Sequence, residues 1–216
     1  VVKAPNTNDE KSVYSNKLKV LKDRLLTNPD IKGFTVTSDI PGKEIDNFFG
    51  CYKKGDDPSS GNGYYRTDID PEYTGFFKAK LLAGRDFTEL DRQAGDKLIV
   101  NLKAMYRIGY NDPNEVIGKI VIADNKEYTI IGVMDDMNYF SVKSEPMPTI
   151  FTVSDWSQKY LAVKYDSSTD LNRIISDVET SFHIVYPNNI PDYIILEDKV
   201  ASTTQTDRTF ALIFGI

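Results

Sequence analysis

Short strand-like segments alternate with amphipathic helical segments along this chain, and this order of elements limits its fold more than any other feature. Apolar residues recur at intervals of three and four within residues 9–27, which predicts a helix with one buried face. A second such helix is predicted within residues 170–186, where five apolar side chains share one face: Leu171, Ile174, Ile175, Val178 and Phe182. Strand patterns and turn residues fill most of the chain between these helices. The order predicts an α+β fold with mixed sheets.

Two shorter helices are expected in the middle of the chain. Asp70-Pro71-Glu72 combines a capping acid, a proline and a second acid, which is typical of a helix start, and this helix is predicted to end near Gly84. Asn101 has the composition of a cap for the next helix, which is predicted to end at Gly109.

Two strand patterns are more informative than the others. Residues 119–122 and 128–133 predict a hairpin whose turn at Asp124-Asn125 suits positive φ angles. Strands predicted at 160–165 and 192–197 flank the helix within 170–186. This second unit resembles half of a ferredoxin-like split βαβ fold.

Composition argues against several classes of function. The 216 residues carry a formal net charge of −6, so the chain has no electrostatic reason to bind nucleic acid. Cys51 is the single cysteine, which excludes an internal disulfide. His183 is the single histidine, which leaves little material for a catalytic triad or a zinc site. No stretch reaches the roughly 18 apolar residues that a membrane helix needs.

Each residue type that could carry chemistry is better explained structurally. His183 is interpreted as a surface or half-buried helical residue, and Cys51 as a small buried side chain. The pairs Asp56-Asp57 and Asp135-Asp136 lack the ligand spacing of a calcium loop and are interpreted as turn acids. Gly61-Asn62-Gly63 lacks the residues that complete a phosphate loop. We therefore predict no catalytic, cofactor or metal site, and no enzyme.

The two ends indicate a piece of a longer protein. Residues 1–3 are expected to be an interior cut, because the chain begins Val-Val-Lys. Residues 209–216 turn abruptly apolar. Two interpretations of this end stay open: a terminal helix that packs on the core, or the approach to a membrane helix.

Several short motifs follow one another in an order that is more specific than any of them alone. Residues 81–87 read Leu-Leu-Ala-Gly-Arg-Asp-Phe, and residues 99–104 read Ile-Val-Asn-Leu-Lys-Ala. Asp112-Pro113, Ile117-Gly118-Lys119 and residues 130–133, Ile-Ile-Gly-Val, complete the series. In this order they resemble the extracytoplasmic (periplasmic core) domain of a MacB/FtsX-type bacterial ABC transporter permease.

The resemblance is firm over roughly residues 64–150, and residues 1–60 carry no matching motif. Asp136-Met137-Asn138 stands where one branch of the family has Asp-Phe-His, so a role for that histidine does not carry over. Arg85 is open to two interpretations, a guanidinium that pins a loop between subdomains or a solvated turn residue. The resemblance implies structural roles for five residues: Gly84, Arg85, Phe87, Gly118 and Gly132.

The family resemblance also implies an architecture and a location. A porter-like α+β subdomain would comprise residues 1–85 plus 146–216, with residues 86–145 inserted as a mainly-β subdomain. The domain would lie between two membrane helices of an inner-membrane permease and face the periplasm. The helices expected within 9–27 and near 198–216 would act as levers that continue into the membrane.

The function implied by the resemblance is mechanical. Such permeases dimerise, as homodimers or paired permeases, and work with a cytoplasmic ABC ATPase. ATP-driven motion would be transmitted to periplasmic partner proteins or substrates in export. In this picture the domain is non-catalytic, needs no cofactor and binds no nucleic acid.

Two other functions stay open on the sequence. A secreted or surface module that binds a small molecule or peptide would have a concave pocket lined by aromatic side chains, for which Tyr64-Tyr65 and Tyr139-Phe140 are candidates. A hydrolase would have a cleft in which His183 or the Asp135-Asp136 pair meets another titratable group.

Overall fold

The computed structural model describes residues 10–40, 45–137, 145–154, 159–189, 191, 193–197 and 210–215. The chain forms two compact units. The terminal unit comprises Val1–Val36 and Gln158–Ile216, and the central unit comprises Thr37–Ser157. The chain therefore passes between the units twice, after Val36 and after Ser157. These limits differ from the predicted 1–85 plus 146–216 and 86–145.

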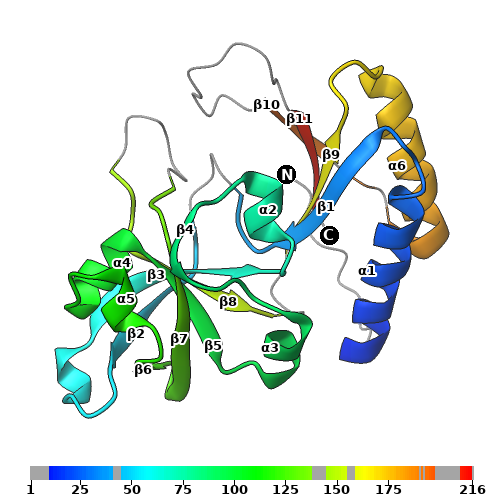
Figure 1. Ribbon diagram of the computed structural model, residues 1–216. Coiled ribbons are helices and arrows are strands. Elements are labelled where there is room, and N and C mark those ends of the chain that lie inside the picture. Colours follow the sequence, from blue (N-terminus) through cyan, green and yellow to red (C-terminus); the bar gives the residue numbers. More distant parts are fainter. Residues whose placement is uncertain are drawn as a thin grey trace. The chain divides into compact units, whose positions relative to one another are not determined.

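The terminal unit is a sheet with two helices packed against it (Figure 1). The sheet has the order β10-β11-β9-β1, and its β10–β11 and β11–β9 pairs are antiparallel. Helices α1 and α6 lie side by side and share a core with the strands, which includes Leu21, Val163 and Phe182. The elements of this unit are α1 (Lys11–Leu25), β1 (Ile31–Thr37), β9 (Tyr160–Tyr165), α6 (Leu171–Val185), β10 (Tyr193–Glu197) and β11 (Phe210–Gly215).

The central unit is built around a closed ring of strands. The ring has the order β3-β2-β6-β7-β5-β8, and β8 pairs with β3 to complete it. The β3–β8 and β5–β7 pairs are parallel and the other pairs of the ring are antiparallel. Strand β4 pairs with β7 outside the ring. The strands are β2 (Phe48–Lys53), β3 (Asn62–Ile69), β4 (Leu81–Gly84), β5 (Lys97–Asn101), β6 (Ile120–Ala123), β7 (Lys126–Met134) and β8 (Thr149–Val153).

Side chains alternate between the inside and the outside of this barrel, as the period of two in a strand requires. The apolar part of the inside includes Tyr64, Leu98, Val121 and Ile150. Helix α4 (Leu102–Ile108) packs on strands from around the ring and adds Met105 to this core. The remaining helices are α2 (Tyr73–Phe77), α3 (Glu89–Ala94), α5 (Pro113–Val116) and the 3₁₀ turn η1 (Pro58–Ser60).

Most of the helices and strands predicted from periodicity are confirmed. Helices α1 and α6 lie within the predicted 9–27 and 170–186. Strands β6 and β7 form the predicted hairpin, and Asp124 and Asn125 have φ angles of 49° and 60°. Asn101 caps α4 through its side chain, and Gly109 ends that helix with a φ of 99°.

One predicted helix is confirmed at its start but is too long, and another is wrong. The helix that starts after Asp70 ends at Lys78, which has a left-handed φ of 54°. Residues 81–84 form strand β4 instead, because their backbone pairs with β7. The expected helix near 198–216 is contradicted over residues 210–215, which form β11 between β10 and β9. Residues 198–209 lie outside the described residues.

The limits of the units have a clear cause in strand pairing. Strands β2 and β3 precede residue 86, and the sequence assigned them to the porter-like part. In the structure β2 pairs with β6 and β3 pairs with β8, so both strands belong to the barrel. Strand β2 itself was not predicted, since Gly50 interrupts a short segment that has no clear alternation.

Replacing Asn101 by alanine tests how the barrel is joined to α4. The Asn101 side-chain oxygen accepts hydrogen bonds from the backbone N–H groups of Ala104 and Thr149, both at 2.9 Å. Its side-chain nitrogen donates to the Met147 carbonyl at 2.8 Å. Asn101→Ala removes a helix cap and leaves buried groups unpaired, so we expect the free energy of unfolding to fall by about 2–4 kcal/mol. Chemical denaturation measures it.

Gln93→Ala is the matched control, because it removes an exposed amide side chain from α3 of the same unit. We expect it to change the free energy of unfolding by less than about 0.5 kcal/mol. Equal effects of the two substitutions would contradict the role given to Asn101.

Candidate functional site

Two of the glycines in the motif series face each other. Gly84 of β4 and Gly132 of β7 are register partners. Gly84 has a φ of 74°, and a Cβ atom there would lie 2.1 Å from the Ile131 carbonyl oxygen. A Cβ atom on Gly132 would lie 2.6 Å from the Arg85 carbonyl oxygen. The two strands approach so closely here that neither position has room for a side chain.

Arg85 follows Gly84 in the sequence and forms a bidentate ion pair with Asp91. Its Nη1 and Nη2 atoms donate to the two carboxylate oxygens of Asp91, at 2.6 and 2.8 Å. Asp91 also accepts hydrogen bonds from the backbone N–H and the hydroxyl of Thr88, at 2.8 and 2.6 Å, and so completes the capping box of α3. Hydrogen bonds from Arg85 and Thr88 lower the pKa of Asp91 well below its usual range, against the effect of burial.

The other two residues of the series lie near this segment in sequence or pairing. Phe87 is buried in an apolar cluster with Ile99 and Phe151. Gly118 has a φ of 80°, and its N–H donates to the Ile130 carbonyl of β7 at 2.8 Å. The series therefore borders β7, the strand that pairs with β4, β5 and β6.

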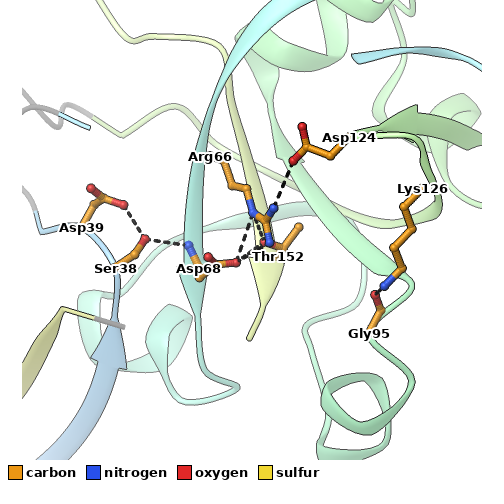
Figure 2. Close-up of polar contacts among 8 residues, drawn as sticks. All are labelled: Ser38, Asp39, Arg66, Asp68, Gly95, Asp124, Lys126 and Thr152. Atoms are coloured by element: carbon orange, nitrogen blue, oxygen red, sulfur yellow. Dashed lines mark hydrogen bonds and ion pairs between the residues drawn. The ribbon is translucent and has the colours of Figure 1, made fainter. Parts of the chain in front are cut away.

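A second polar cluster, which the sequence did not predict, lies on β3 (Figure 2). We call it the Asp68 cluster. The Arg66 Nε donates to the Thr152 hydroxyl at 2.9 Å, and its Nη2 lies 3.1 Å from Asp68 Oδ1. The Thr152 hydroxyl donates to the same Asp68 oxygen. The Arg66 Nη1 lies 3.4 Å from the exposed carboxylate of Asp124, in the β6–β7 turn. The Asp68 side chain is only 1% exposed, so it is a buried charge with a charged partner.

The Asp68 cluster also includes the segment that enters the central unit. The Ser38 N–H donates to the Asp68 carbonyl at 2.8 Å, and the Asp68 N–H donates to the Ser38 hydroxyl at 2.8 Å. The Ser38 hydroxyl in turn donates to the carboxylate of Asp39, as Figure 2 shows. Thr37 pairs with Ile69, and Ile69 pairs with Val153 of β8.

Figure 2 also shows Lys126 beside this region. Lys126 donates to the Gly95 carbonyl and lies 5.0 Å from the centre of the Tyr128 ring. This contact fixes the end of the β6–β7 hairpin to the turn that follows α3.

The residues that could have carried catalysis are divided between the two units. His183 is exposed on α6. Cys51 is buried inside the barrel, and burial raises the pKa of its thiol to about 12. Asp136 accepts a hydrogen bond from the Lys103 N–H at 3.1 Å, and burial raises its pKa. Among the described residues there is no group of three or more metal-ligating side chains.

The Asp56-Asp57 and Gly61-Asn62-Gly63 segments have local structural roles. Asp57 caps the 3₁₀ turn η1 by accepting a hydrogen bond from the Ser59 N–H at 2.8 Å. Asn62 begins β3, and Gly50 and Gly63 are register partners in the β2–β3 pair. Tyr64 lies inside the barrel, whereas Tyr139-Phe140 lies outside the described residues.

The family model for the MacB-like periplasmic core domain matches residues 13–181. The chain belongs to this family. It is thus the periplasmic or extracellular core domain of a MacB-like ABC transporter permease, as the motif series predicted. No curated protein matches the chain.

Two solved structures have a similar fold. The extracellular domain of the noncanonic ABC-type transporter YknZ from Gram-positive bacteria is 18% identical, with a TM-score of 0.53 over 79% of this chain and 82% of that one. The periplasmic region of MacB from Actinobacillus actinomycetemcomitans is 14% identical, with a TM-score of 0.50 over 77% of this chain and 73% of that one. The α+β class with mixed sheets agrees with both.

Membership of the MacB-like family gives the location of the domain outside the membrane that anchors the transporter. Within the described ranges, no helix combines the length and the apolar composition needed to cross a bilayer.

Alanine at the paired glycines of this MacB-like domain tests the close approach of β4 and β7. Gly84→Ala places a Cβ against the Ile131 carbonyl at a left-handed φ, and Gly132→Ala places one against the Arg85 carbonyl. We expect each substitution to lower the free energy of unfolding by at least about 2 kcal/mol. Gly50→Ala is the matched strand control, because a Cβ there meets no atom within 4 Å. If Gly50→Ala costs as much as the other two, space at the β4–β7 pair is not the cause.

The ion pair between Arg85 and Asp91 predicts a pH-dependent contribution to stability. Asp91 has a lowered pKa in the folded domain, so its contribution is full above the unfolded pKa of about 4 and is lost as the pH falls. Asp91→Asn should therefore lower the free energy of unfolding at pH 7 by about 1 kcal/mol, a modest value because water screens the half-exposed Arg85.

The difference between wild type and Asp91→Asn should shrink as denaturation is repeated from pH 7 down to about pH 3. Glu89→Gln is the control, since it alters an exposed acid of the same helix that pairs with Arg92. A difference that stays constant over this pH range would contradict the prediction.

Proposed function

We propose that this domain transmits ATP-driven motion to periplasmic partner proteins or substrates in export, and that it catalyses no reaction itself. Membership of the MacB-like family implies a cytoplasmic ABC ATPase and a dimeric or paired permease. In this proposal the terminal unit is the porter-like part and the central unit is the inserted, mainly-β part.

One observation carries the proposal: the segment that enters the central unit and the strand from which the chain leaves it are both hydrogen-bonded to Asp68. The chain enters this unit at Thr37 and Ser38, and Ser38 is bonded to the backbone of Asp68 on β3. The chain leaves after β8, whose Thr152 is bonded to the Asp68 carboxylate. Strand β3 thus lies between the incoming and the outgoing segments within the central unit.

The closed barrel makes this anchorage suitable for carrying load. A displacement of either connecting segment would be shared by the hydrogen bonds around the ring, since the ring has no free edge at which strands could peel apart. Buried ion pairs with several hydrogen bonds are costly to break, which favours a rigid response. We infer that Gly84, Arg85, Phe87, Gly118 and Gly132 support this rigidity and bind no ligand.

The alternative functions receive less support from the described residues. A groove of about 230 Å³ in the terminal unit is smaller than typical ligand pockets and has no aromatic lining. Its lining residues are Arg24, Leu25, Thr27, Asn28, Ile31, Asp177, Thr180 and Ser181. A hydrolase would need an activated nucleophile, whereas the Cys51 thiol is buried inside the barrel and burial raises its pKa to about 12.

Hydrogen–deuterium exchange on the complete transporter, in lipid and with its ATPase, tests the proposal. We expect a non-hydrolysable ATP analogue to change the exchange of backbone amides in β1 and at Ser38, where the chain enters the central unit. The backbone amides of buried barrel residues such as Val121 and Ile130 are the internal control, and their exchange should not change. An unchanged exchange pattern throughout the domain would refute force transmission.

A further inference from the structure

An aromatic and cationic surface covers α4 and the adjoining β2–β3 hairpin. We call it the α4 surface and define it by Phe48, Lys53, Gly63, Tyr106, Arg107 and Tyr110. Phe48 is 58% exposed and Tyr106 is 52% exposed, which are high values for aromatic side chains. Neither the motif series nor the Asp68 cluster includes any of these residues.

Phe48 is held in place although it is exposed. Its ring lies over Gly63, where a Cβ atom would be only 2.1 Å from the Phe48 Cζ. Its ring also packs edge-on against Tyr65, with centroids 5.1 Å apart. A partner that covered this ring would bury apolar area without first having to order it.

Two cations of the α4 surface are fixed by aromatic rings rather than by acids. Arg107 donates from Nη1 to the Gly63 carbonyl at 2.7 Å, and its guanidinium carbon lies 5.9 Å from the Tyr64 ring centre. Lys53 Nζ lies 4.5 Å from the Tyr110 ring centre. No carboxylate of the described chain lies within salt-bridge distance of either cation. Asp112, which follows Tyr110, accepts hydrogen bonds from Asn114.

We propose that the α4 surface docks a segment of a partner protein that presents carboxylates next to apolar side chains. The argument is charge complementarity: two cations have no acidic partner among the described residues, in a chain whose net charge is −6. Tyrosine and arginine are also enriched among the residues that dominate binding energy in protein interfaces, and phenylalanine is enriched in interfaces. Arg107 retains donors for a planar carboxylate while one of its N–H groups bonds to Gly63.

The proposal adds a partner chemistry to the proposed function but is tested by binding alone, without ATPase or membrane. A lack of peptide binding would therefore not contradict force transmission. An unchanged exchange pattern would not contradict docking at the α4 surface.

The experiment is a fluorescence-polarisation titration of the protein against a labelled peptide of alternating glutamate and leucine. We expect saturable binding that weakens as salt is added. Arg107→Gln should weaken it at least tenfold, Lys53→Gln and Phe48→Ser should each weaken it, and Arg107→Lys should give an intermediate loss. Lys19→Gln and Leu90→Ser are matched controls at an exposed cation and an exposed apolar side chain elsewhere, and should leave binding unchanged.

Circular dichroism of each variant separates lost binding from lost folding. A peptide of alternating lysine and leucine and a single-stranded oligonucleotide are tested in parallel, and sedimentation shows whether the chain binds itself. The proposal is overturned if the acidic peptide does not bind or binds no better than the basic one. It is also overturned if Arg107→Gln leaves peptide binding intact, if the oligonucleotide binds with the same Arg107 dependence, or if Arg107→Gln abolishes self-association instead.

Discussion

The pairing of β3 with β8 is the interaction on which the central unit depends. Without it, the six strands would be an open sheet with two edges, and Arg66 and the buried Asp68 and Thr152 would lose their common environment. The pairing is parallel and joins residues more than eighty positions apart, which makes it slow to form but cooperative once formed. Everything that enters or leaves the central unit passes beside this pair of strands.

The two ion pairs of the central unit have different physical characters. Asp68 is buried and Arg66 is mostly buried, so desolvation opposes their attraction; the Thr152 hydroxyl balances it by accepting a hydrogen bond from Arg66 and donating one to Asp68. Arg85 is half exposed, so water weakens its attraction to Asp91, and the capping of α3 adds a local reason for that contact. The first pair specifies which strands meet, whereas the second fixes one loop against one helix.

The sequence predicted the elements whose signals are local. Helices α1 and α6 have long apolar periods, and the β6–β7 turn has two residues that tolerate positive φ. Strand β4 was mistaken for the end of a helix because its four residues follow a strong helix start, and only pairing with β7 makes them extended. Strand β11 was likewise assigned to a helix, since its apolar run gives no sign of its neighbours β9 and β10.

The candidate site shows the same difference between local sequence signals and contacts that form only in the fold. The motif series pointed to Gly84 and Gly132, but nothing in the sequence said that the two glycines face each other. Arg66, Asp68 and Thr152 carried no recognisable pattern, because Thr152 is distant in sequence and meets Asp68 only when the barrel closes. The alternation of Tyr64, Arg66 and Asp68 on one face of β3 was the available signal, and charged residues on an inward face are rarely assigned to a core.

The position of Cys51 has a practical consequence for work on this domain. Its thiol is shielded by the barrel wall and stays protonated at neutral pH, so it reacts poorly with maleimides and similar reagents. A cysteine introduced on the surface can then be labelled with a dye or spin probe while the native one is left in place. The domain is thus already suited to distance measurements between chosen pairs of positions.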